Sequence, residues 1–156
     1  SSSGIGAQIA VKLLSLGAHV VITGRDQNKI DSVIKKCESL SRGRALGVVA
    51  DIQVESDVKN LVNITLREFG GIHILVITRA IHSSVQVVTH LVVPYLEQSK
   101  GNIINISSIG AEQPMPKAMA YNMAKNALNM FTKCLALELA PKGIRVNSVR
   151  YSKTTL

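Results

Sequence analysis

A tyrosine and a lysine in the second half of the chain have the spacing of a proton-transfer pair. Tyr121 and Lys125 are four residues apart in segment 119–140, whose apolar residues recur at helical spacing, so both side chains project from one face of the predicted helix. A nearby ammonium favours phenolate and lowers a tyrosine pKa from about 10 toward the range in which a general acid or base works well. We therefore predict that Tyr121 gives or takes a proton with help from Lys125.

Ser108 is the third member of this candidate catalytic group. It lies thirteen residues before Tyr121, directly after segment 102–107, which has the β-branched content of a buried strand. A neutral hydroxyl at that point can hold a substrate oxygen beside the phenol. The tyrosine and lysine alone would also fit a solvated helix face. The serine after a strand, and a glycine pattern at the start of the chain, favour the chemical interpretation.

The chain starts with a glycine-rich turn that leads into a predicted helix. Apolar residues Ile9, Leu13 and Leu16 recur at helical spacing, and Gly17 is expected to end the helix. Glycines at a helix start let a pyrophosphate approach backbone N–H groups, where the helix N-terminus favours negative charge. The residues expected to bind a dinucleotide in this way are Ser3, Gly4, Ile5 and Gly6.

These features together resemble the short-chain dehydrogenase/reductase family over nearly the whole chain. The resemblance rests on Ser108, Tyr121 and Lys125 in this spacing, with NIINISS before them, LALELAPKGIRVNSV after them, and the second half of a Thr-Gly-x-x-x-Gly-x-Gly loop at the start. It implies an NAD(P)-dependent oxidoreductase, similar to 3-oxoacyl and small-carbonyl reductases, that moves a hydride between nicotinamide and a ketone or secondary alcohol. Tyr121 would be the proton donor or acceptor, Ser108 would orient the substrate, and Lys125 would bind the nicotinamide ribose and lower the tyrosine pKa.

Alternating strands and helices indicate an α/β fold with a doubly wound, Rossmann-like parallel sheet. The helix predicted after Ser56, its expected N-cap, ends at Gly70, and the helix predicted over 83–98 is bent or ended near Pro94. Ligands are expected at the carboxyl ends of the strands. The predicted strands are 19–23, 45–50, 72–78, 102–107 and 144–149.

The chain departs from the family pattern in three places. The strand and the Thr-Gly before the glycine-rich turn are absent, so we hypothesise a fragment of a longer chain or an incomplete gene model. Ile77-Thr78-Arg79-Ala80 replaces Asn-Asn-Ala-Gly, the following connection is short, and the family's fourth catalytic residue, an asparagine, has no counterpart. Arg150-Tyr151-Ser152 replaces Pro-Gly and the substrate-covering segment. The alternative function is therefore a catalytically impaired paralogue with a structural or nucleotide-binding role.

The residues after the second predicted strand bear on the choice of cofactor. Arg25 follows Gly24 and resembles the family's NADP pattern, in which a guanidinium meets the 2′-phosphate. Asp26 could instead bind the ribose 2′-hydroxyl of NAD, or it could cap the next helix. We favour NADP, with NAD as the other possibility. The resemblance places Asp51 beside the adenine ring, although a strand-end turn residue would also fit.

Composition limits the other function classes. With 156 residues and 46% hydrophobic content, the chain is expected to form one domain, 1–156. A net charge of +8 could suggest nucleic acid, but 3% aromatic residues and dispersed Lys and Arg argue against it. Apolar runs are too short for a membrane span, so we expect a cytoplasmic protein, with an upstream targeting segment left open.

Cysteines, histidines and partners complete the expectations. Cys37 and Cys134 are predicted to be core thiols, since their spacing matches neither a metal site nor a disulfide framework. His82 and His90 are predicted to be surface residues, and no metal is expected. The resemblance implies a small carbonyl or alcohol as substrate, and a homodimer or homotetramer formed through the helix 83–98 and the helix that carries Tyr121.

Overall fold

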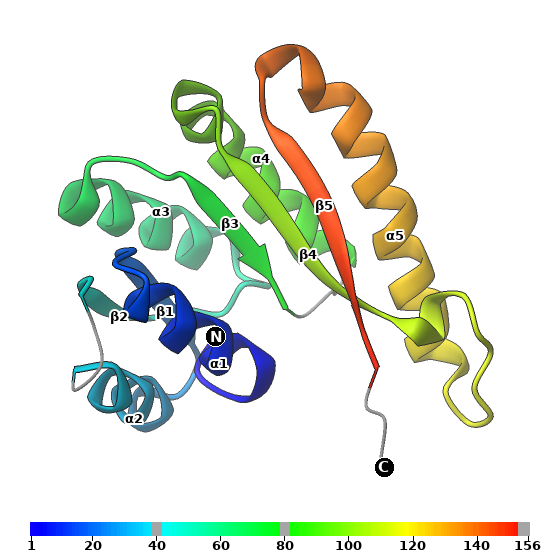
Figure 1. The fold of residues 1–156 in the computed structure, drawn as a ribbon, viewed down its shortest axis with the longest axis horizontal. Coiled ribbons are helices and arrows are strands. Elements are labelled where there is room, and N and C mark those ends of the chain that lie inside the picture. Colours follow the sequence, from blue (N-terminus) through cyan, green and yellow to red (C-terminus); the bar gives the residue numbers. More distant parts are fainter. Residues whose placement is uncertain (39–41, 79–81, 153–156) are drawn as a thin grey trace. The chain divides into compact units, whose positions relative to one another are not determined.

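The computed structural model describes residues 1–38, 42–78 and 82–152, which divide into two compact units, Ser1–Gly70 and Gly71–Leu156 (Figure 1). Every strand pairing in both units is parallel, and helices alternate with strands along the chain. The predicted α/β, Rossmann-like fold class is therefore confirmed. Within the described residues, no helix is long and apolar enough to cross a membrane.

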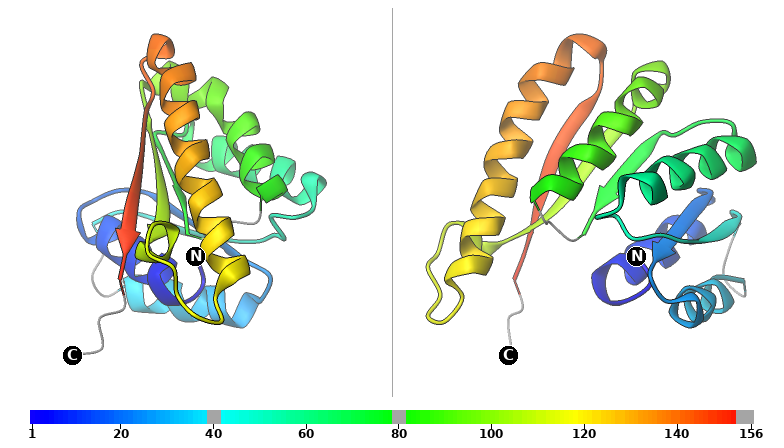
Figure 2. Two further views of the ribbon diagram at one scale, coloured as in Figure 1. Left: turned by 90° about the vertical axis from the view of Figure 1, so that its right-hand side faces the viewer. Right: turned by 180° about the vertical axis from the view of Figure 1, so that it is seen from behind.

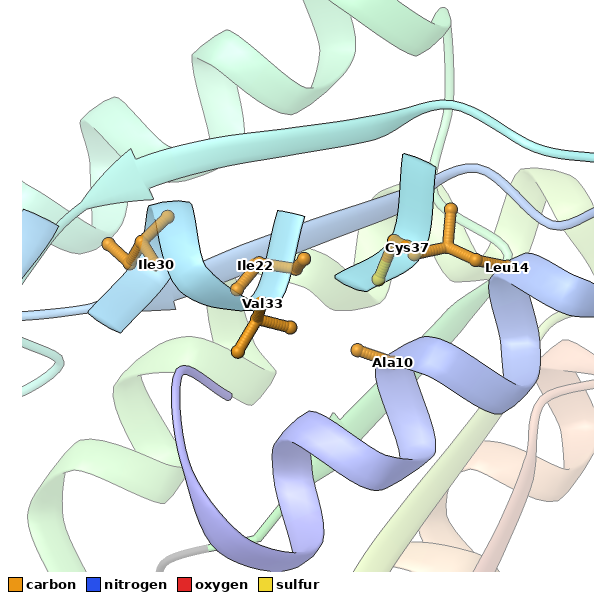
Figure 3. Close-up of a cluster of buried hydrophobic side chains, with 6 residues drawn as sticks. All are labelled: Ala10, Leu14, Ile22, Ile30, Val33 and Cys37. Atoms are coloured by element: carbon orange, nitrogen blue, oxygen red, sulfur yellow. The ribbon is translucent and has the colours of Figure 1, made fainter. Parts of the chain in front are cut away.

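The first unit has a two-stranded parallel sheet. Its elements in order are α1 (Gly4–Ser15), β1 (Val20–Gly24), α2 (Gln27–Glu38), β2 (Ala45–Val49) and α3 (Glu55–Phe69). Strands β1 and β2 pair in register from Val20 with Ala45 to Gly24 with Val49. A core cluster joins α1, α2 and β1 (Figure 3), and it consists of Ala10, Leu14, Ile22, Ile30, Val33 and Cys37.

Helix α1 buries a different face from the predicted one. Gly6, Ala10 and Leu14 are its buried residues, whereas Leu16 is 68% exposed because the helix ends at Ser15. Small residues carry little hydrophobic signal in a sequence, so the line that starts at Gly6 and Ala10 was not recognisable from periodicity alone. The small side chains let α1 pack close to its neighbours.

The predicted Ser56 N-cap is also wrong. Helix α3 begins at Glu55, so Ser56 lies inside its first turn, and the extended residue before the helix is Val54, which makes no side-chain cap. The helix ends as predicted at Gly70, whose left-handed backbone (φ 76°) suits glycine.

The second unit has a three-stranded parallel sheet in the order β3-β4-β5. Its elements are β3 (Ile74–Ile77), α4 (His82–Ser99), β4 (Asn102–Ser108), the 3-10 helix η1 (Ile109–Ala111), α5 (Met119–Leu139), the 3-10 helix η2 (Ala140–Lys142) and β5 (Arg145–Tyr151). Figure 2 shows α4 and α5 on the same side of this sheet. Strand β4 is central, and its carboxyl end carries Ser108.

Helix α4 covers the predicted segment 83–98 and runs through Pro94, so of the two expectations there, a bend or an end, the end is wrong. Pro94 has no N–H to donate to the carbonyl of His90, but both residues are exposed, so water can satisfy that carbonyl. The predicted inward residue Val92 is buried, and the sequence missed the buried polar Thr89 beside it.

The two cysteines have different environments. Cys37 is buried in the core of the first unit, as predicted, and burial raises the pKa of its thiol. Cys134 is exposed, so its assignment as a core thiol is wrong. It lies on the outer face of α5, whose exposed apolar residues imitate a core pattern.

Candidate functional site

Ser108 is held at the point where β4 ends. Its side chain is almost fully buried, and its Oγ accepts a hydrogen bond of 3.2 Å from the backbone N–H of Gly110, which caps η1. In the β4–β5 ladder Ser108 lies opposite Tyr151, a neighbour that the sequence did not predict. The predicted strand-to-loop position of Ser108 is confirmed.

Tyr121 and Lys125 lie in the first turns of α5 and share a face, as their spacing predicts. The Lys125 Nζ is 5.9 Å from the centroid of the Tyr121 ring. Tyr121 is 47% exposed, which leaves the phenol accessible to a reactant. The pair therefore combines an accessible proton donor with a fixed cation.

Lys125 extends from α5 to the end of β4. The side chain is 8% exposed, and Nζ donates a hydrogen bond of 2.7 Å to the backbone carbonyl of Ile106. Burial lowers the pKa of Lys125 because a charged ammonium is poorly solvated there. The Lys125 ammonium is thus held at Ile106, which lies two residues before Ser108 on β4.

Gly110 connects Ser108 with the first turn of α5. A Cβ built on Gly110 would be 2.7 Å from the side-chain amide of Asn122 and 3.5 Å from Cε1 of Tyr121. Gly110 donates its N–H to Ser108 Oγ, and a side chain added to it would reach the Tyr121 ring, so Gly110 lies between two members of the predicted catalytic group. The structure therefore brings Ser108, Tyr121 and Lys125 into one region.

A buried polar contact fixes α5 against β4 below this region. Asn105 is fully buried, and its Nδ2 donates to Thr132 Oγ1 at 2.9 Å, while Thr132 Oγ1 donates to the Leu128 carbonyl at 2.7 Å. Buried hydrogen bonds of this kind favour one packing arrangement over others. Asn105 belongs to the NIINISS segment, but its pattern gave no indication that it bonds to a helix.

The glycine-rich turn of the first unit has the backbone form that the sequence predicts. Ser3 is extended, and Gly4 starts α1 with a left-handed φ of 57°, which favours glycine. The first N–H groups of a helix lack acceptors within the helix, so they suit an anion. Ser1 hydrogen-bonds the backbone of Thr23, with its Oγ accepting from the Thr23 N–H at 2.8 Å, so the turn lies at the carboxyl end of β1.

Beyond β1, Asp26 acts as a helix cap. Its Oδ1 accepts a hydrogen bond of 3.3 Å from the Lys29 N–H, and this bond lowers the pKa of the carboxyl. The cap interpretation of Asp26 is therefore confirmed.

Arg25 points its guanidinium toward solvent. The side chain is 71% exposed, and its Nη1 is 3.8 Å from Asp51 Oδ2. Asp51 Oδ1 also accepts from the Gln53 N–H at 3.0 Å, so Asp51 is a turn residue after β2. The structure brings these two predicted cofactor-binding residues together within the first unit.

Histidine and metal predictions fall partly within the described residues. His90 is exposed, as predicted, while the side chain of His82 lies outside the described part. In the described ranges, no three His, Cys, Asp or Glu side chains are grouped closely enough to hold a metal ion.

Known proteins resemble this chain over almost its full length. The family profile for short chain dehydrogenase matches residues 1–87 and 77–154. Human "Dehydrogenase/reductase SDR family member 2, mitochondrial" is 34% identical over 171 positions, which cover 96% of this chain and 61% of that protein. The chain thus spans about 61% of the length of this curated relative. The two profile matches overlap at 77–87, where the sequence predicts a shortened connection.

Two solved structures with bound cofactors are similar in fold. L-sorbose reductase of Gluconobacter frateurii, complexed with NADPH and L-sorbose, has a TM-score of 0.89 at 29% identity, covering 96% of this chain and 65% of that one. The 3-ketoacyl-(acyl-carrier-protein) reductase of Brucella melitensis, complexed with NADH, has a TM-score of 0.88 at 30% identity, covering 96% and 71%. Together with the profile match, these similarities show that the chain belongs to the short-chain dehydrogenase family.

Proposed function

We propose that this protein transfers a hydride between NADP(H) and a ketone or secondary alcohol, with Tyr121 as the proton donor or acceptor. The observation that carries the proposal is the fixed Lys125 ammonium 5.9 Å from the centre of an accessible Tyr121 ring, at the end of the strand that carries Ser108. The nicotinamide cofactor supplies the hydride chemistry when it is bound. The protein's own residues hold the substrate oxygen and move its proton.

Ser108 and Lys125 have distinct roles in this proposal. The Ser108 hydroxyl already accepts a hydrogen bond from Gly110, so its own proton can be donated to a substrate oxygen. Lys125 holds its ammonium 5.9 Å from the centre of the Tyr121 ring and binds the nicotinamide ribose. The glycine-rich turn, Ser3 to Gly6, receives the pyrophosphate, and Asp51 lies beside the adenine.

Arg25 supports NADP over NAD. Because Asp26 is engaged as a helix cap, it is less suited to bind a ribose hydroxyl, whereas the exposed Arg25 guanidinium can meet a 2′-phosphate. The similar solved structures include one complexed with NADPH and one with NADH. NAD therefore stays the second candidate.

Replacing Arg25 with alanine is the experiment that tests the cofactor assignment. We expect NADPH to bind roughly 10- to 100-fold more weakly, since a hydrogen bond to a charged group contributes about 1.5–3 kcal/mol, while NADH binding stays unchanged. Fluorescence titration of both cofactors measures this. Arg42→Ala, a change of the same type at another exposed arginine of the first unit, should alter neither affinity. Equal weakening of NADPH and NADH by Arg25→Ala would contradict the NADP assignment.

A catalytically impaired paralogue is the alternative function. The observation in its favour is that no asparagine occurs between Asn63 and Asn102, where the family has its fourth catalytic residue. In this alternative the chain binds the nicotinamide cofactor but catalyses no hydride transfer. Steady-state reduction of a panel of carbonyl compounds with NADPH separates the two functions.

We also propose that α5 forms a contact between copies of the chain. Met123, Met130 and Leu137 are each more than half exposed and lie seven residues apart, so they form one apolar stripe along the helix. Exposed apolar patches of this kind mark association surfaces. The same stripe explains why Cys134 appears to be a core residue in the sequence.

The double variant Met130→Glu/Leu137→Glu should separate the subunits. Burying two carboxylates in an apolar contact is costly, so we expect a monomer where the unchanged protein is a dimer or tetramer. Light scattering after size-exclusion chromatography measures the mass. Leu16→Glu, at an equally exposed leucine of the first unit, serves as the control and should leave the mass unchanged. A monomeric unchanged protein would contradict the proposed contact.

A further inference from the structure

Two asparagines on α5 follow directly after the predicted catalytic residues of that helix. Asn122 is next to Tyr121, and Asn126 is next to Lys125, so the two amides lie four residues apart on one face. The assigned roles of Ser108, Tyr121 and Lys125 involve neither of them. Both amides reach the loop that connects Ser108 to α5.

Asn122 bridges the two ends of a short part of this loop. In the amide orientation that satisfies both groups, its nitrogen donates to the Gly110 carbonyl at 3.2 Å and its oxygen accepts from the Met115 N–H at 2.9 Å. Asn126 Nδ2 donates to the neighbouring Ala111 carbonyl at 2.8 Å. Three hydrogen bonds therefore tie the loop to the first turns of α5.

The Asn122 bond is linked to Ser108 through one residue, Gly110, whose N–H and carbonyl belong to consecutive peptide groups. Gly110 offers its carbonyl to Asn122 and its N–H to Ser108 Oγ, at 3.2 Å in each case. The Tyr121 ring is near the same glycine, since a Cβ added to Gly110 would be 3.5 Å from Cε1. The position of Ser108 Oγ relative to α5 thus depends on where Gly110 is held.

An ion pair from β5 contacts the other side of the loop. Arg150 pairs with Glu112, but both side chains are more than half exposed. Exposed ion pairs contribute little to stability, since water and salt screen them. The amides of α5 are therefore the main polar attachment of the loop in the described part of the chain.

We propose that Asn122 is a positioning residue, which holds Gly110 so that the Ser108 hydroxyl and the Tyr121 phenol address the same substrate oxygen. The inference rests on the proposed function for its catalytic meaning. Misplacing a reacting group by about 1 Å can cost as much as 100-fold in rate. A weaker hold on Gly110 should therefore lower the chemical step without changing how the cofactor binds.

Two substitutions of Asn122 and a matched control test this role. Asn122→Ala removes both hydrogen bonds, whereas Asn122→Asp retains an acceptor for the Met115 N–H and loses the donor to Gly110. Asn129→Ala removes another amide of α5, one whose oxygen has no hydrogen-bond partner. Hydrogen exchange of the Met115 amide, kcat and KM for a carbonyl substrate, and NADPH affinity are measured for each variant of the full chain.

The expected results distinguish the bond from Asn122 to the Gly110 carbonyl from the bond that Asn122 accepts from the Met115 N–H. The Met115 amide should exchange about tenfold faster in Asn122→Ala, and at the unchanged rate in Asn122→Asp and Asn129→Ala. Both Asn122 variants should lose tenfold or more in kcat, to a limit of about 100-fold, with unchanged NADPH affinity. An unchanged hydrogen-exchange rate of the Met115 amide in Asn122→Ala would show that Asn122 does not hold the loop. A parallel loss of kcat and NADPH affinity would overturn the positioning role, since general loosening of the fold lowers both.

Failure of the proposed function has a different signature. If the unchanged chain reduces no carbonyl compound, the proposed function and the catalytic part of this inference are overturned together. The Met115 exchange rates still decide whether Asn122 holds the loop, because they do not depend on turnover.

Discussion

Tyr121→Phe is expected to lower carbonyl reduction by about 10²- to 10⁴-fold, which is the usual contribution of a positioned general acid or base. The substitution removes the one hydroxyl while it keeps the ring, whose centroid is 5.9 Å from the Lys125 Nζ. Stability and NADPH affinity should therefore stay the same, and kcat should carry the loss. Steady-state kinetics with NADPH, together with a cofactor titration, measures the effect.

Tyr95→Phe is the matched control, since Tyr95 lies on α4 and has no proposed role in proton transfer. It should retain the activity of the unchanged protein. Turnover in Tyr121→Phe above about a tenth of the unchanged rate would exclude Tyr121 as the proton donor or acceptor, and Tyr151, opposite Ser108 on β5, would then be the next phenol to substitute.

The predicted positions of Ser108, Tyr121 and Lys125 depended on spacing along single elements, and this is why the structure places these residues as the spacing predicts. A separation of four residues on a helix places Tyr121 and Lys125 on one face whatever surrounds the helix. Ser108 follows a β-branched run, so its position at a strand end could also be predicted from the neighbouring residues alone. Asn122 could not be recognised in the same way, because its partners Gly110 and Met115 come from a loop without periodicity.

Two errors in the predicted fold arise because periodicity identifies an apolar face but shows neither where the helix ends nor what covers that face. Leu16 continues the apolar spacing of α1 but lies beyond the last residue of that helix. Cys134 continues the spacing on the outer face of α5, which is apolar although it is exposed. Pro94 was expected to bend or end the helix over 83–98, and the helix does not end there, because an exposed proline removes only a hydrogen bond that water can replace.

Lys125→Met is expected to have the second large effect. Methionine fills a similar volume but cannot donate to the Ile106 carbonyl, contact a nicotinamide ribose or hold a cation near the Tyr121 ring. We expect NADPH to bind about tenfold more weakly and turnover to fall by about 10²-fold or more. Lys133→Met, at an exposed lysine of the same helix, should change neither. Full activity in Lys125→Met would rule out the proposed role of the ammonium.

The unchanged protein and Lys125→Met also test the environment of Lys125, through the pH dependence of the free energy of unfolding. Burial lowers the native-state pKa of Lys125 below the ordinary value of 10.5, so the buried charge costs stability at neutral pH. As the pH rises past the native-state pKa, the folded protein loses this proton while the unfolded chain keeps it until about 10.5. The unfolded state then binds more protons, and the free energy of unfolding increases with pH.

Lys125→Met lacks this increase, and because other titrating groups are common to both proteins, their effects cancel in the difference. The unchanged protein should therefore gain stability relative to Lys125→Met between neutral pH and 10.5 in urea unfolding, and a relative loss would mean that the ammonium is stabilised where it lies.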